Sequence, residues 1–295
     1  MSAELNSCRI CPRACGVDRR SEKGFCGASP HPVINLWQLH KGEEPVISGV
    51  RGSGTIFFSH CNLRCVYCQN YVISQQGRGR EYSIADLAAI MLDLAARGAH
   101  NINFVTPTHF TPQVRGAIVI ARDQGLSLPV VWNSSGYENA ATLRTLEGLV
   151  DIYLPDFRYF SHTAARLYSG AADYPERAQA ASLEMFRQTG HLQTDTHGLA
   201  VRGLLCRLLV LPGNVNRVDQ TLAWIAQHLG TETAISLMAQ YYPTHRASDF
   251  PEINRPINET EFEEIVNLAA DLGFENGFIQ EVNATPEWTP EFVKE

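Results

Sequence analysis

The chain concentrates its thiols near its N-terminal end. Of its eight cysteines, seven lie before residue 69, in one group of four and one group of three. The first residues, MSAELNSCRICPRAC, contain no apolar core of the kind that a secretion signal requires, so we expect a cytoplasmic protein in a reducing compartment. Clustered thiols in such a compartment are more often metal ligands than disulfides. The pattern therefore predicts two metal-binding segments.

The group of three stands in FFSHCNLRCVYCQN, where Cys61, Cys65 and Cys68 follow an apolar run with the spacing C-x3-C-x2-C. A [4Fe–4S] cluster has four irons and prefers thiolate ligands. Three protein thiols would leave one iron open to a small molecule, much as catalytic metal sites keep a vacancy that structural sites lack. The spacing thus predicts a catalytic cluster. The alternatives are buried core cysteines or a fourth ligand such as Cys206, which otherwise reads as a small core residue.

The group of four comprises Cys8, Cys11, Cys15 and Cys26, with the spacing C-x2-C-x3-C-x10-C. Four thiols close a tetrahedral zinc site or saturate a second Fe–S cluster. The surrounding segment has little apolar content, so a metal would supply folding free energy that a small core cannot. The alternative is a set of reduced, unligated thiols on a flexible arm. The spacing alone does not separate zinc from iron–sulfur.

These cysteines precede an alternation of apolar strands and amphipathic helices. Strands are predicted at 54–59, 102–107, 128–136, 150–157, 203–213 and 234–243. Helices are predicted at 83–98, 113–124, 139–149, 175–188, 218–229 and 259–272. Most strands are continuous apolar runs, which indicates burial on both faces, as in a parallel sheet covered by helices. The α/β alternation predicts a partial (β/α)6 barrel, with functional residues at the C-terminal ends of the strands.

Three regions organise the chain in this interpretation. Residues 1–53 form a cysteine-rich, metal-binding N-terminal module, residues 54–250 the barrel core, and residues 251–295 a C-terminal helix and tail. Within the module, 31–49 predicts two short strands, and Glu43 and Glu44 read as a solvated turn rather than a catalytic pair. Residues 191–203 alternate between turn and apolar residues and predict a hairpin insertion.

The composition excludes some classes of function. Hydrophobic content of 44% and charged content of 19% are ordinary for a globular protein. A formal charge of −7 argues against a broad basic face for nucleic acid, because phosphates are held mainly by Lys and Arg. No apolar run is long enough to span a membrane.

The cysteine loop also resembles a known family. CNLRCVYC is similar to the C-x3-C-x-aromatic-C loop of the radical S-adenosylmethionine (SAM) superfamily, with Tyr67 at the aromatic position. The likeness runs through about 54–243 and is greatest to the pyruvate formate-lyase activating enzymes: CVYCQN, WNSSGY, DIYLPDFRY and LLCRLLVLPG resemble successive strand-end motifs. The N-terminal cysteines, SLMAQYYP and INRPINETEFEEIV resemble a branch of activating-enzyme homologues whose substrates are largely unassigned, and extend the likeness over nearly the whole chain.

The resemblance implies several contacts to SAM. Tyr67 would hold the adenine, chiefly through its backbone, and Asn133 and Ser134 would lie near the methionine moiety. Asp156 would coordinate a cation or SAM. Arg158 stands where the family has a lysine that meets the carboxylate, a task that suits a guanidinium.

Other strand-end positions match less closely. Arg207 and Tyr242 would lie near the cofactor, and Tyr241 is a candidate for contact with substrate. The family's G-G-E motif at the end of strand two, which receives the SAM amino group, is replaced here by NFVTPTHFTP, with hydroxyls and an imidazole but no carboxylate. His109 in this stretch is either a structural histidine or a substrate contact.

The resemblance implies a radical SAM oxidoreductase that takes electrons from a donor such as flavodoxin or ferredoxin. In that family, one electron cleaves SAM to methionine and a 5′-deoxyadenosyl radical, which abstracts hydrogen from a substrate. The leading hypothesis is activation of a glycyl radical enzyme, and the competing one is modification of a small molecule or peptide. A hypothesis of another class is an Fe–S electron carrier or sensor, which predicts four-ligand clusters and no strand-end contacts to SAM.

Overall fold

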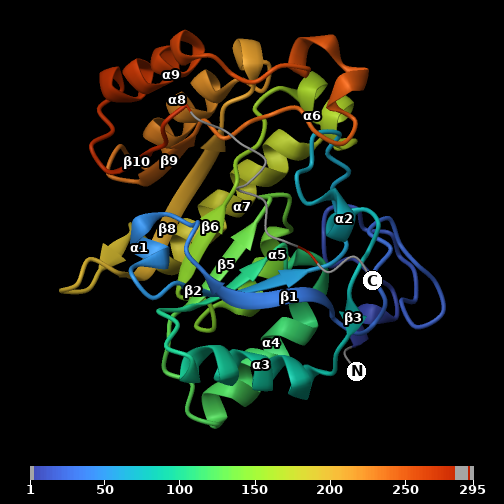
Figure 1. Ribbon diagram of the computed structural model, residues 1–295. Helices are drawn as coiled ribbons and strands as arrows, with labels where there is room; N and C mark the ends of the chain where they lie inside the picture. The colour runs from blue at the N-terminus through green and yellow to red at the C-terminus, as the bar shows by residue number, and fades with distance from the viewer. Residues whose placement is uncertain (1–2, 283–291, 293–295) are drawn as a thin grey trace.

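The computed structural model describes residues 3–282 and residue 292, and Figure 1 shows their arrangement around one large sheet. The rest of the predicted C-terminal tail lies outside these residues. Among the described residues, no helix combines the length and the apolar character needed to cross a bilayer.

Parallel strands form the centre of the sheet, in the order β2-β4-β5-β6-β8-β9. These strands are β2 (Ser53–Phe58), β4 (Ile102–Val105), β5 (Val130–Ser134), β6 (Ile152–Pro155), β8 (Ala200–Leu209) and β9 (Ala234–Met238). They confirm the six predicted strands and the parallel sheet. An unpredicted parallel strand, β10 (Gly277–Ile279), extends the sheet beside β9. The predicted hairpin is also present, because β7 (Gln193–Thr194) pairs antiparallel with β8.

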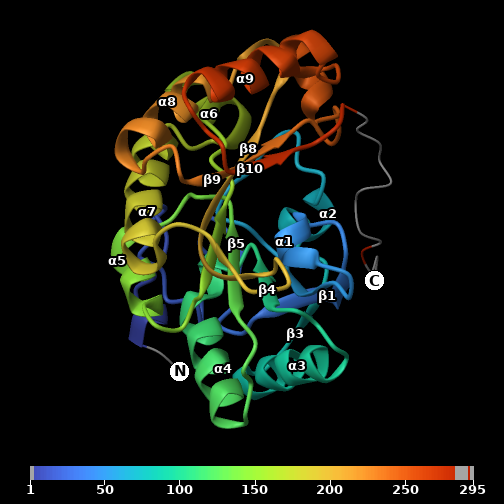
Figure 2. The same ribbon diagram turned by 90° about the vertical axis from the view of Figure 1, so that its left-hand side faces the viewer.

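Helices between the strands cover the outer face of the sheet. They are α3 (Ile84–Ala96), α4 (Thr111–Asp123), α5 (Ala140–Leu143), α6 (His162–Ser169), α7 (Tyr174–Thr189), α8 (Val218–His228) and α9 (Glu259–Asp271). Ser83 and Asp86 form the capping box that starts α3, within the predicted helix 83–98. In Figure 2, α5, α7 and α8 line one side of the sheet, opposite α1 (Pro45–Ser48) and α2 (Tyr71–Ser74). The helix predicted at 139–149 is shorter, and α6 was not predicted.

The N-terminal segment joins the same sheet. β1 (Val33–His40) pairs antiparallel with β2, and β3 (Arg80–Glu81) pairs with β1. The prediction of two strands within 31–49 was wrong for the second one, which is helix α1, with a proline in its first turn. Because β1 lies beside β2, the segment that follows β1 turns onto the inner face of the barrel.

The inner face changes character along the strands. Side chains alternate along a strand, so Val131 and Asn133 share one face of β5, and Leu205 and Arg207 share one face of β8. Ile47 of α1 is fully buried in an apolar cluster with Val131 and Leu205. Helix α1 therefore plugs the lower, apolar part of the barrel, and the polar residues further along the strands surround the space above it.

Candidate active site

The three-cysteine loop follows the C-terminal end of β2. Each of its sulfurs has a hydrogen-bond partner: the Leu63 amide 3.4 Å from Cys61, the Ser169 hydroxyl 2.9 Å from Cys65, and the Ser74 hydroxyl 3.2 Å from Cys68. Outer-shell hydrogen bonds of this kind orient thiolate ligands and tune a cluster. The loop thus presents three thiols that are close together and individually supported.

Burial disfavours the ionised form of two of these thiols, Cys61 and Cys68. It raises the pKa of Cys61 to about 12 and that of Cys68 to about 11, and the nearby Cys65 adds to both shifts. Bound iron would compensate for this cost, because cationic metal stabilises thiolates. Cys206 is fully buried, and because side chains alternate along β8 it faces away from the cavity that the neighbouring Arg207 lines, so it is not placed to complete the set. The donor set fits a cluster held by three protein thiols.

A cavity of about 970 Å³ adjoins this loop. Its wall includes Cys68 from the loop and the strand-end residues Asn133, Asp156 and Arg207. Pockets for single drug-sized ligands span about 300–1,000 Å³, so this one has room for a nucleotide-sized cofactor and a small second molecule. The polar ends of the inner strand faces therefore line a site large enough for chemistry between two ligands.

Buried ion pairs connect the strand ends. Arg207 donates from Nη1 to Glu43 Oε2 at 2.8 Å, from Nε to Asp156 Oδ1 at 2.8 Å and from Nη2 to Asn133 Oδ1 at 2.6 Å. Arg158 donates from Nη2 to Asp156 Oδ2 at 2.6 Å. Burial alone would lower the pKa of Arg207, but Asp156 and Glu43 raise it above its ordinary value. Both arginines are therefore cations in the cavity wall.

Glu43 and Glu44 belong to this wall, so the prediction of a solvated turn was wrong. Glu43 Oε1 accepts hydrogen bonds from Asn103 and Asn133, each at 3.1 Å. Glu44 is 8% exposed, burial raises the pKa of its carboxyl, and its Oε2 has no hydrogen-bond partner among the described residues. The sequence reading missed these acids because only the docking of α1 on the inner face delivers them there.

The comparisons with known proteins agree with this geometry. The sequence profile of the radical SAM superfamily matches residues 55–182, which include the cysteine loop and the strands β4 to β6. Residues 55–182 therefore match a radical SAM domain. Such a domain implies an enzyme that uses a [4Fe–4S] cluster and SAM.

Relatives extend the likeness beyond the domain. The uncharacterized protein MJ0674 of Methanocaldococcus jannaschii is 28% identical over 273 residues, which are 90% of this chain and 75% of that protein. Among solved structures, methylornithine synthase (PylB) has a TM-score of 0.50 and 11% identity, covering 73% of this chain and 62% of that one. HydG, a maturase of the [FeFe]-hydrogenase, has a TM-score of 0.54 and 12% identity, covering 79% and 52%. The chain spans about half to three fifths of these two structures, and the likeness shows the fold.

Most of the residues implied to contact SAM line the cavity beside the radical SAM loop. They are Tyr67, Asn133, Ser134, Asp156, Arg158 and Arg207. The Tyr67 hydroxyl lies 2.5 Å from that of Tyr159. Arg158 lies near Cys65 and Tyr67, and its Nε has no partner among the described residues. Their roles stay predictions, but the fold brings these six residues together.

Tyr242 is placed differently. The described residues that line the cavity include Tyr241 but not Tyr242. The ring of Tyr241 packs edge-on against Tyr67, with centroids 5.6 Å apart, and its hydroxyl donates to the Ile253 carbonyl at 2.6 Å. These contacts fix Tyr241 in the wall. Beyond it the chain returns to the cysteine loop, where the Arg246 amide donates to the Val66 carbonyl at 2.7 Å.

The end of the second parallel strand, β4, carries no carboxylate of its own. Thr106 lines the cavity, but His109 is buried elsewhere, with Nε2 2.8 Å from the Ser59 carbonyl. Burial lowers the pKa of His109 to about 3, so the imidazole is neutral. The position of His109 favours the structural interpretation over contact with substrate. An acid from the N-terminal segment, Glu43, reaches Asn103 of β4.

Proposed function

We propose that this chain is a radical SAM enzyme of the activating-enzyme-homologue branch, with the cluster ligated by Cys61, Cys65 and Cys68. When bound, the reduced cluster supplies one electron that cleaves SAM to methionine and a 5′-deoxyadenosyl radical, which abstracts a hydrogen atom from the substrate. The observation that carries the proposal is the position of three adjacent thiols beside a large cavity whose wall presents buried charged groups.

The residues around the cavity have distinct tasks in this proposal. Arg158 lines the cavity and would meet the SAM carboxylate, while Asp156 holds its guanidinium by a hydrogen bond from Nη2. Tyr67 closes the wall next to the cysteine loop and excludes water. Asn133 and Arg207 are already bonded to each other and to Glu43, so they form a rigid floor under both ligands.

For the substrate, the sequence resemblance supports a glycine residue in a partner protein, which would make the chain an activase. A glycyl radical on that partner, detected by electron paramagnetic resonance (EPR) after incubation with SAM and a reductant, would test this candidate directly. The partner loop would have to enter the cavity, so a soluble peptide with the same glycine should compete.

The geometry favours a second candidate, a small molecule with a hydrogen-bond donor. Glu44 lines the cavity, and its buried Oε2 atom has no hydrogen-bond partner among the described residues. An unpaired buried acceptor costs free energy, and a hydroxyl or ammonium group of a ligand would relieve that cost once the carboxylate turns toward the cavity. A substrate of this kind needs no wide opening, since the cavity already has the volume for it and SAM together.

The test of the proposed function is anaerobic reconstitution followed by incubation with SAM and dithionite. The wild-type protein and the control Cys206→Ala should release 5′-deoxyadenosine, whereas Cys65→Ala should release none. The EPR spectrum of the reduced cluster should also change when SAM is added. An intact cluster that neither responds to SAM nor cleaves it would contradict the proposal and favour an electron carrier.

A further inference from the structure

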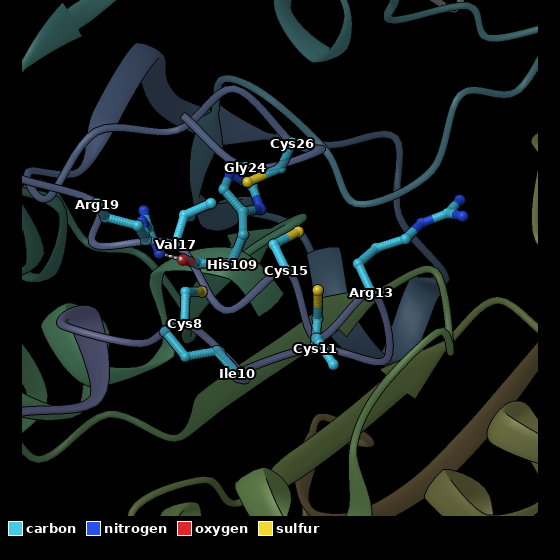
Figure 3. A pocket seen from close by; sticks show the side chains of 11 residues that line it. Cys8, Ile10, Cys11, Arg13, Cys15, Val17, Arg19, Gly24, Cys26 and His109 are labelled. Atoms are coloured by element: carbon cyan, nitrogen blue, oxygen red, sulfur yellow. Dashed lines mark hydrogen bonds between the residues drawn. The ribbon is translucent and has the colours of Figure 1, made fainter. Parts of the chain in front are cut away.

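A second thiol site lies outside the radical SAM loop. Cys8, Cys11, Cys15 and Cys26 line one small pocket, and Figure 3 shows their side chains around a common space. Two turns of the N-terminal segment bring them together, closed by hydrogen bonds from the Gly16 amide to the Cys8 carbonyl and from the Ala14 amide to the Cys11 carbonyl. Cys15 is exposed, which leaves a path from solvent to the pocket.

The backbone of the segment lies close to several of these sulfurs. The backbone of Arg13 acts to lower the pKa of Cys11, and the backbone of Ala28 acts in the same direction on Cys26, against the larger effect of burial. In the three-cysteine loop, the amide two residues after Cys61 donates to the sulfur of Cys61. The Phe25 amide also donates to Cys15, at 3.3 Å. Amides aimed at sulfur favour metal-bound thiolates over free thiols, so the backbone is arranged for a ligand.

The small size of the pocket favours a single metal ion over a four-iron cluster. Its volume of about 10 Å³ is roughly that of one water-sized sphere, far less than a four-iron cluster needs. Among the residues that the structure describes, no three Cys, His, Asp or Glu side chains already surround a single ion. Binding therefore requires the sulfurs to turn inward to about 2.3 Å from the metal, which rotation of the short cysteine side chains can achieve.

The segment is fastened to the cysteine loop of the catalytic domain. Arg13, two residues from Cys11, donates from Nε to the Asn62 carbonyl at 2.9 Å and from Nη1 to the Gly170 carbonyl at 2.6 Å. Its guanidinium also lies 3.8 Å from the ring centre of Phe25, next to Cys26. Arg13 thus links both parts of the four-thiol segment to the backbone between Cys61 and Cys65.

We propose that Cys8, Cys11, Cys15 and Cys26 bind one Zn²⁺ ion, and that this site holds Arg13 against the cluster loop. Zinc fits because four thiolates close its tetrahedral shell and the pocket has room for a single ion. The ion takes the place of a hydrophobic core, since only Leu5, Cys8 and Ile10 form a buried apolar cluster within the described part of this segment. The zinc site itself does not depend on the proposed radical SAM reaction, whereas its link to the cluster loop rests on the proposed function.

The test uses the full chain in which Cys61, Cys65 and Cys68 are all replaced by Ala, which leaves the N-terminal set as the clustered thiols. Purified anaerobically from medium containing zinc and iron, this variant should retain about one zinc per chain and no cluster iron. Adding Cys8→Ser and Cys11→Ser should remove the zinc, whereas adding Cys206→Ser should not. Substitution with Co²⁺ should give the visible absorption of a tetrahedral thiolate site, a readout independent of activity.

Two results would overturn the zinc proposal. One is a folded triple-Ala variant without metal whose N-terminal thiols all react freely with a thiol reagent. The other is about four irons per chain that disappear with Cys8→Ser, which would mean a second cluster.

Arg13→Ala in the otherwise wild-type chain tests the link to the catalytic loop. Zinc should stay at about one per chain, while retention of the [4Fe–4S] cluster falls several-fold, in the range typical of outer-shell partners. Unchanged iron content would refute the link, and this outcome is separate from any failure to cleave SAM.

Discussion

The buried pair between Glu43 and Arg207 offers the sharpest test of the cavity wall. Replacing Glu43 by Gln removes a charge but keeps an oxygen that can accept from Asn103 and Asn133. The two charged side chains are 8% and 13% exposed, so solvent screens them little. Breaking a buried pair by removing one partner costs about 3–5 kcal/mol.

The expected loss is smaller here, because Arg207 keeps its second carboxylate, Asp156. We expect Glu43→Gln to lower the free energy of unfolding by about 2 kcal/mol. At about 2–4 °C per kcal/mol for a domain of this size, the Tm should fall by about 4–8 °C. Glu43→Ala, which also removes the acceptor for two amides, should cost about 1 kcal/mol more for each hydrogen bond lost.

Thermal unfolding at pH 7 under reducing conditions measures the effect, with Glu81→Gln on the exposed strand β3 as the control. That control should stay within about 0.5 kcal/mol of wild type. A double-mutant cycle with Arg207→Gln isolates the pair, and its coupling energy should reach about 2 kcal/mol. A coupling near zero, or an unchanged Tm in Glu43→Gln, would refute the reasoning that this pair is a buried structural element of the site.

Three further predictions concern buried groups. Burial raises the pKa of Glu44 above its ordinary value of 4.5, so the folded state loses stability as the pH rises past 4.5. Glu44→Gln should therefore have a higher Tm than wild type at pH 8, and this difference in Tm should be smaller at pH 5. Burial lowers the pKa of His109 from 6.5 to about 3, so stability should fall as pH drops below 6.5, by up to about 1.4 kcal/mol per pH unit. In urea titrations at pH 7 and pH 5, His109→Gln should lose that slope, and an unchanged slope would show that another group controls it. Ile47→Ala opens a cavity under α1 and should cost about 2–5 kcal/mol in the same urea assay, whereas a cost below 1 kcal/mol would mean that α1 does not plug the barrel.

Local sequence signals determined the frame of this protein. Alternation of apolar runs with amphipathic stretches predicted the parallel strands, and the helix predicted at 83–98 corresponds to α3, which Ser83 and Asp86 cap. These features depend on residues within one turn or one strand of each other, so the chain reveals them directly. The cysteine spacing 61-65-68 is equally local, because all three thiols lie in one loop.

Only the tertiary structure decided what surrounds the thiols. Glu43 meets Arg207 across a separation of 164 residues, and no periodic pattern in the sequence encodes that contact. It arises because β1 pairs with β2 and α1 then fills the lower part of the barrel. The link from Arg13 to Gly170 spans 157 residues in the same way. Such contacts follow from the packing of whole elements, whereas periodicity reports only the face that each element buries.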